Sequence, residues 1–216
     1  MRKYAVVLCL LALFSCQKEE LTVTEGETET SFLADGQLTG LVKSVASHDG
    51  TFDDLVDLSS CFSINFPYRI LLNGYEYEVN SIEDLKPITK YDFVVPLYPF
   101  SITYGNYQQG EVPTQEVFYN LVEQCNNGLL YDQRITCVDF YYPIQISVFN
   151  QETSDFETIS FTHDRETFME IELFDAGTLA SINYPITLHL ENDETIMITS
   201  DQQLKDEILL LLPICQ

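Results

Sequence analysis

The chain has 216 residues, of which 34 are acidic and only 10 are basic, so its formal net charge is −24. A surface this negative repels nucleic acid and anionic lipid head groups, which excludes both as partners. The composition is 45% hydrophobic and includes 14 Phe and 13 Tyr, enough to build the buried core of one domain or of two small ones.

Residues 1–15 have the composition of a secretory signal peptide. Arg2 and Lys3 precede an apolar run from Tyr4 to Ser15 that is too short to span a bilayer and ends at a small residue. Cleavage would leave eight basic residues against 34 acidic ones, a net charge of −26. Such a charge suits solubility, cationic partners or calcium, and a solvated acidic surface is its simplest explanation.

The segment Leu13-Phe14-Ser15-Cys16 resembles the lipobox of bacterial lipoproteins, in which the cysteine is lipidated and becomes the new N-terminus. The resemblance implies that Cys16 anchors the chain to a membrane. The alternative is an ordinary secreted protein in which Cys16 occurs by chance.

The residues after Cys16 begin QKEELTVTEGETETS, which is polar, acidic and without apolar periodicity, and we expect residues 16–48 to be a disordered tether. An acidic stretch directly after a lipidated cysteine resembles the surface-export signal of Bacteroidota lipoproteins. The resemblance implies display on the cell surface from the outer membrane. A plain linker facing the periplasm is the alternative.

One pattern recurs four times along the rest of the chain. Each copy alternates apolar and polar residues and has an aromatic residue directly before a proline, which predicts a half-buried strand with the proline on its outward face. Proline cannot donate to a strand ladder, so it also protects a sheet edge from pairing with other chains. The four segments are SINFPYRILL (63–72), VPLYPFSITY (95–104), DFYYPIQISV (139–148) and SINYPITLHL (181–190).

A turn, a return strand and a helix follow each proline segment. Asn73-Gly74 is a strong hairpin signal, and Asn192-Asp193 is the corresponding turn in the last copy. Capping residues such as Thr114 and Ser200 precede the helical segments. The predicted fold class is therefore α+β, with antiparallel sheets built from four ββα units. Two units would pair in residues 49–130 and two in 131–216, each pair forming a four-stranded sheet with its helices on one face.

Four cysteines remain beyond Cys16, and an even number in an exported chain suggests disulfides with three possible connectivities. Cys61 and Cys137 each begin the first strand of a pair, whereas Cys125 and Cys215 each end a second helix. This symmetry predicts the bridges Cys61–Cys125 and Cys137–Cys215. Free buried thiols are the alternative.

No motif of a known catalytic or cofactor site is present. The sequence lacks HExxH, CxxC, GxSxG and glycine-rich phosphate loops, so we expect no cofactor and no transition metal. We expect His163 and His189 to be ordinary surface residues.

The acid cluster HDGTFDDLVD, residues 48–57, is the only weak metal candidate. Its oxygens could surround calcium, but it lacks the order of an EF-hand loop and that loop's final glutamate. A turn at Asp49-Gly50 followed by a short acidic helix is the simpler interpretation. The candidate ligands are Asp49, Asp53, Asp54 and Asp57.

The run DGTFDDLVDLSSCFSINFPYRILLNGYEYEVNSIEDL and the later YPITLHL segment resemble a group of uncharacterised flavobacterial lipoproteins. The resemblance covers most of residues 49–216. It implies an exported lipoprotein with tandem αβ units and brings no catalytic residues.

These observations favour a non-catalytic surface binding or accessory module, with a protein, peptide or glycan as partner. The alternative is a hydrolase of cell-surface polymers that uses carboxylates, and such an enzyme should have a deep cleft with two converging acids.

Overall fold

The structure, a computed structural model, describes residues 31–175 and 177–214. The predicted signal peptide, Cys16, the first half of the predicted tether and Cys215 lie outside the described residues. The class is α+β, as predicted, with helices and four small antiparallel sheets. Every helix among the described residues is too short or too polar to span a lipid bilayer.

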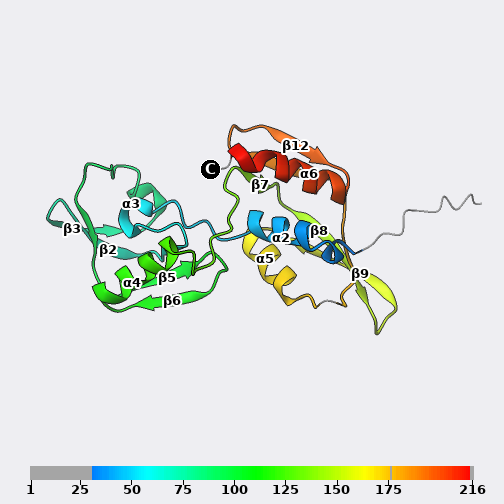
Figure 1. Ribbon diagram of the computed structural model, residues 1–216, viewed down its shortest axis with the longest axis horizontal. Helices are drawn as coiled ribbons and strands as arrows, with labels where there is room; N and C mark the ends of the chain where they lie inside the picture. Colours follow the sequence, from blue (N-terminus) through cyan, green and yellow to red (C-terminus); the bar gives the residue numbers. More distant parts are fainter. Residues whose placement is uncertain (1–30, 176, 215–216) are drawn as a thin grey trace, which may run out of the picture.

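Two separate clusters of buried side chains divide the molecule into two domains (Figure 1). The first cluster uses residues between 52 and 130. The second combines residues 32–46 with residues from 131 onward, and Tyr107 also packs against it. The first domain, residues 49–130, is therefore inserted into the second domain, which consists of residues 31–48 and 131–214.

The prediction of a disordered tether is wrong for residues 31–48. They form the 3₁₀ turn η2 (Phe32–Ala34) and helix α2 (Gly36–Val45). The Asp35 side chain caps α2 by accepting from two backbone N–H groups. Leu38, Val42 and Val45 are at most 1% exposed, because α2 lies between two helices of the second domain, α5 and α6 (Figure 1).

The first domain contains two three-stranded sheets, with strand orders β1-β5-β6 and β3-β2-β4. Its strands are β1 (Phe62–Ile64), β2 (Tyr68–Leu72), β3 (Tyr75–Val79), β4 (Val94–Pro96), β5 (Phe100–Tyr104) and β6 (Gln109–Val112). Its helical segments are α3 (Asp54–Asp57), η3 (Ile82–Asp84) and α4 (Gln115–Asn126).

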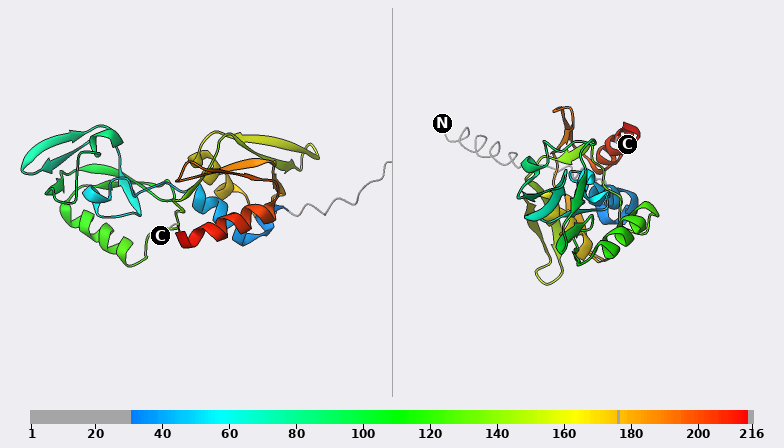
Figure 2. Two further views of the ribbon diagram at one scale, coloured as in Figure 1. Left: turned by 90° about the horizontal axis from the view of Figure 1, so that it is seen from above. Right: turned by 90° about the vertical axis from the view of Figure 1, so that its left-hand side faces the viewer.

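The second domain also contains two three-stranded sheets, with strand orders β10-β8-β9 and β12-β11-β7. Its strands are β7 (Val138–Phe140), β8 (Ile144–Asn150), β9 (Asp155–Phe161), β10 (Ala180–Ile182), β11 (Ile186–Leu190) and β12 (Thr195–Ile198). Its remaining helical segments are α5 (Asp164–Leu173), α6 (Asp201–Leu211) and η4 (Leu212–Ile214). In the left view of Figure 2, the strands of each domain lie above, while α4 and the pair α2 and α6 lie below.

Each predicted proline strand is in fact two strands that belong to different sheets. The strand before one proline pairs with the strand after the other: β1 pairs with β5, and β4 pairs with β2. The same exchange joins β7 to β11 and β10 to β8. The predicted four-stranded sheet is therefore replaced by two smaller sheets in each domain, because a proline cannot continue the ladder. All four prolines are exposed, as predicted, and all four follow cis peptide bonds.

The aromatic residue before each proline attaches the broken strand to the rest of its domain. In the second domain, the Tyr142 hydroxyl donates to Asp164 at 2.8 Å, and the Tyr184 hydroxyl donates to Asp201 at 2.7 Å. Each of these aspartates begins the helix of the same unit. In the first domain the corresponding rings pack against neighbouring aromatic rings instead.

The first predicted disulfide is present. Cys61 and Cys125 are joined, with their Cα atoms 5.9 Å apart, and the bridge links the start of β1 to the last turn of α4. Cys137 is buried directly before β7. Because Cys215 lies outside the described residues, the Cys137–Cys215 bridge stays a prediction.

Candidate functional site

The two chain segments that connect the domains run side by side. The backbone N–H of Ile135 donates to the carbonyl of Ser44 at 3.1 Å, and that of His48 donates to Gly105 at 2.9 Å. The Tyr107 hydroxyl donates to the Ala46 carbonyl at 3.0 Å. The first domain is thus held against the second by hydrogen bonds from several segments.

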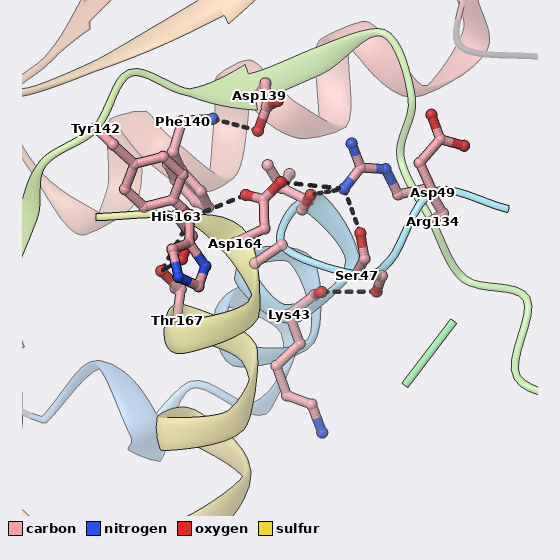
Figure 3. Close-up of polar contacts among 12 residues, drawn as sticks. Lys43, Ser47, Asp49, Arg134, Asp139, Phe140, Tyr142, His163, Asp164 and Thr167 are labelled. Carbon is pink, nitrogen blue, oxygen red and sulfur yellow. Dashed lines mark hydrogen bonds and ion pairs between the residues drawn. The ribbon is translucent and has the colours of Figure 1, made fainter. Parts of the chain in front are cut away.

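Arg134 is the central cation of this junction (Figure 3). Its guanidinium donates to the carbonyls of Val45, at 2.6 Å, and Ser47. It also lies 3.7 Å from a carboxylate oxygen of Asp164 at the start of α5. The Arg134 side chain is only 12% exposed. It ties its own connecting segment to the other one, at Val45 and Ser47, and to α5, at Asp164.

Asp164 is held in a partly buried polar network (Figure 3). It accepts from the Tyr142 hydroxyl, which also lies 2.9 Å from the Thr167 hydroxyl. Burial, and after it the charge of Asp139, raises the pKa of Asp164 to about 6, although Tyr142 and Arg134 act in the opposite direction. These contacts fix the position of α5 relative to the junction.

A pocket of about 330 Å³ opens at this junction. Three of its walls are aromatic: the rings of Tyr107 and Tyr131 meet Phe168 edge-on, with centroids 5.6 Å and 5.9 Å away. The ammonium of Lys43 lies 5.2 Å above the Phe168 ring and pairs with Glu172. The complete lining is Lys43, Asn106, Tyr107, Gln108, Tyr131, Phe168, Met169 and Glu172.

The pocket combines fixed rings with polar groups at its edge. The Tyr131 hydroxyl lies 3.0 Å from the Ser47 hydroxyl, and that of Tyr107 is used by Ala46, so both rings are held by the junction itself. A mainly apolar, largely preformed cavity with a few polar side chains is typical of a small-molecule or side-chain binding site. No single stretch of the sequence indicates this pocket, because its residues come from four separate segments.

A smaller pocket of about 270 Å³ lies in the first domain, beside Pro67 and Pro99. It is lined by Pro67, Tyr68, Arg69, Glu78, Leu97, Pro99 and Phe100. Each of these two pockets contains a single carboxylate, Glu78 here and Glu172 at the junction. Neither pocket therefore has the two converging acids that a carboxylate-dependent hydrolase requires.

The predicted acid cluster is divided by the fold. Asp53 and Asp57 are brought together in the first domain's core, where they are 1% and 0% exposed. Asp54 is exposed on the other side of α3. Asp49 accepts from the backbone N–H and the hydroxyl of Thr51, so it closes the predicted turn instead of joining the buried pair.

The lack of space at position 50 explains why the predicted turn contains a glycine there. A Cβ atom at this position would lie 2.6 Å from the carbonyl oxygen of Ser60, which is closer than any real side chain allows. The turn therefore packs directly on the backbone that leads into β1.

We expect the first domain to lose stability as the pH rises. Burial raises the pKa of Asp53 to about 7, and burial and then the charge of Asp53 raise the pKa of Asp57 well above its usual range. A folded state that holds protons more tightly than the unfolded chain is most stable at low pH, and the stability is lost as the pH rises through the folded pKa values. Urea unfolding, with a chelator present to remove metal ions, should show the unfolding free energy of the first domain falling by roughly 2–3 kcal/mol between pH 5 and pH 8.

Asp53→Asn is the matched variant, because it removes the charge and keeps the shape. It should flatten this pH dependence in the first domain. Stability that instead increases from pH 5 to pH 8 in the unmodified chain would contradict the assignment.

The histidines do not form a catalytic arrangement among the described residues. His48 lies 2.6 Å from the Ser63 hydroxyl and packs on Phe52 and Tyr107, and burial lowers its pKa. His163 and His189 have exposed side chains, as predicted. His163 also serves as the N-cap of α5.

Within the described ranges, one group of three close metal-ligating side chains occurs, Cys61 with Cys125 and Asp132. Its two sulfurs form the disulfide, so they are not available as thiolate ligands. No protein-family model, curated protein or solved structure gives a significant match to this chain. The resemblance to flavobacterial lipoproteins therefore stays a prediction.

Proposed function

We propose that this protein is a lipid-anchored module of the bacterial outer membrane, displayed at the cell surface, which binds a partner and has no catalytic activity of its own. The anchor would be Cys16, and the residues up to 30 would separate the folded domains from the membrane. The partner would be a protein, peptide or glycan of the envelope.

The observation that carries the proposal is the aromatic pocket at the domain junction. Its volume of about 330 Å³ suits one side chain or one sugar ring rather than a large substrate. Aromatic rings bind apolar faces of either ligand, and the amides of Asn106 and Gln108 can hydrogen-bond to its polar groups. The single carboxylate in the pocket favours binding over hydrolysis.

Met169→Lys tests the pocket directly. Met169 is exposed and lines the pocket from α5, so a lysine there should obstruct the ligand without disturbing the core. Leu173→Lys is the matched control, because Leu173 is exposed on the same helix one turn away and does not line the pocket. We expect Met169→Lys to weaken binding about tenfold or more, at a typical cost of about 1.4 kcal/mol or more.

The measurement is quantitative binding of the purified chain to fractionated outer-membrane protein, peptide and glycan. Equal binding by both lysine variants would place the partner elsewhere. Turnover of a surface polymer that is abolished by a single Asp or Glu substitution would favour the hydrolase instead.

Cys16→Ala tests the anchor. We expect the variant to lose lipid labelling and to move from the membrane fraction to the soluble fraction, because one cysteine would carry the whole attachment. Protease treatment of intact cells then distinguishes surface display from a periplasmic location. Unchanged membrane partition of the variant would contradict the lipoprotein assignment.

A further inference from the structure

Two acids are buried in the first domain without a basic partner. Asp53 accepts from the backbone N–H of Ile64 at 2.8 Å, and Asp57 accepts from that of Ser59 at 3.1 Å. Each carboxyl uses one oxygen in this way, and the other oxygen is buried without any hydrogen-bond partner. No ion pair to either acid occurs among the described residues.

A third unpartnered oxygen is buried in the same core, on a different element. The hydroxyl of Tyr68 on β2 is buried, with the residue 5% exposed, and it has no hydrogen-bond partner. Tyr68 belongs to the same buried cluster as Val56 of α3, and burial and then the charges of Asp53 and Asp57 raise the pKa of its hydroxyl. Helix α3 with its N-cap Asp53, and the start of β2, therefore contribute three unpartnered buried oxygens to one core.

Buried oxygens of this kind need a partner. A buried hydrogen-bonding group without one costs about 1–3 kcal/mol, and a buried carboxylate without a counter-charge costs more. A water molecule could donate to two of these oxygens, but at a pH where the acids are ionised it would leave their negative charges unbalanced. A cation satisfies all three oxygens and also balances the charge.

We propose that Asp53, Asp57 and Tyr68 form a site for a hard, oxygen-preferring cation of the calcium class. The ligand atoms are Oδ1 of Asp53, Oδ2 of Asp57 and the hydroxyl oxygen of Tyr68. Calcium accepts irregular arrangements of carboxylate and neutral oxygens, whereas magnesium demands a near-ideal octahedron. Of the four acids that the sequence suggested, only the two buried ones take part.

The site is independent of the proposed function, because it lies in the core of the first domain and not in the junction pocket. Its role would be to complete the fold of that domain. The acids sit at the start and end of α3, so the cation would hold this short helix against β2.

Calcium binding by the full chain, after treatment with a chelator, is the test. At pH 8 we expect one Ca²⁺ per chain in native mass spectrometry. We also expect the first domain's unfolding midpoint to rise by roughly 5–10 °C when Ca²⁺ is in tenfold excess over Kd. The double variant Asp53→Asn, Asp57→Asn should lose this shift. Asp49→Asn with Asp54→Asn is the matched control and should keep it.

Tyr68→Phe keeps the test decisive if the double variant does not fold. With a cation in the site, the substitution should weaken Ca²⁺ binding about fivefold through the lost oxygen. Absence of Ca²⁺ binding to the original chain at millimolar concentration would overturn the proposal. So would binding that persists in both the double variant and Tyr68→Phe.

Discussion

Replacing Cys61 and Cys125 together by alanine is expected to lower the unfolding free energy of the first domain by about 4 kcal/mol. The bridge closes a loop with a sequence separation of 64 residues, and a cross-link of this length removes a large part of the unfolded chain's conformational entropy. For a domain of this size the unfolding midpoint should fall by roughly 15 °C or more. Calorimetry of the whole chain can follow both domains at once.

The second domain serves as the internal control in that experiment, because its core does not include either cysteine. Its transition should stay in place. Peptide mapping of the original chain without reduction should yield the Cys61–Cys125 fragment and, separately, the predicted Cys137–Cys215 fragment. A first-domain midpoint that does not move would show that the bridge does not stabilise the fold.

Replacing Arg134 by methionine is expected to lower stability by roughly 3 kcal/mol. Methionine keeps much of the apolar stem but leaves the Val45 and Ser47 carbonyls and the Asp164 carboxylate without their donor. Removing one member of a partly buried ionic network costs several kcal/mol, because the remaining groups stay desolvated. Urea unfolding of the two proteins at pH 7 measures the difference.

Arg165→Met is the matched control, since Arg165 is exposed and lies on α5 directly after Asp164, the carboxylate that Arg134 pairs with. It should change stability by less than about 0.5 kcal/mol. If Arg134→Met has an equally small effect, the junction is held by its backbone hydrogen bonds alone. Protease sensitivity at residues 46–49 and 131–135 would then also stay unchanged.

Local signals along the chain predicted much of the fold. The Asn73-Gly74 turn, the caps at Thr114 and Ser200 and the outward prolines all have physical causes within a few residues. The helix at residues 36–45 carried a readable signal too, because Leu38, Val42 and Val45 share one helical face. The tether prediction was wrong here because it extended the polar composition of residues 17–31 too far along the chain.

The candidate sites were much less predictable. The sequence suggested a short acidic helix at Asp53 to Asp57, but it did not show that Asp53 and Asp57 are buried. Tyr68 could not be connected to them, because β2 and α3 join one core only after the sheet has formed. The junction pocket had no signal in any single segment.

Local patterns along the chain predicted the α+β class, the outward position of the four prolines and the Cys61–Cys125 pairing, because each depends on short-range signals or on a symmetry visible in the sequence. The tertiary structure alone decided the exchange of strands between sheets, the insertion of one domain into the other, and the pocket and buried acids. These features depend on which distant segments meet, and that choice is made by the packing of the whole core rather than by local propensity.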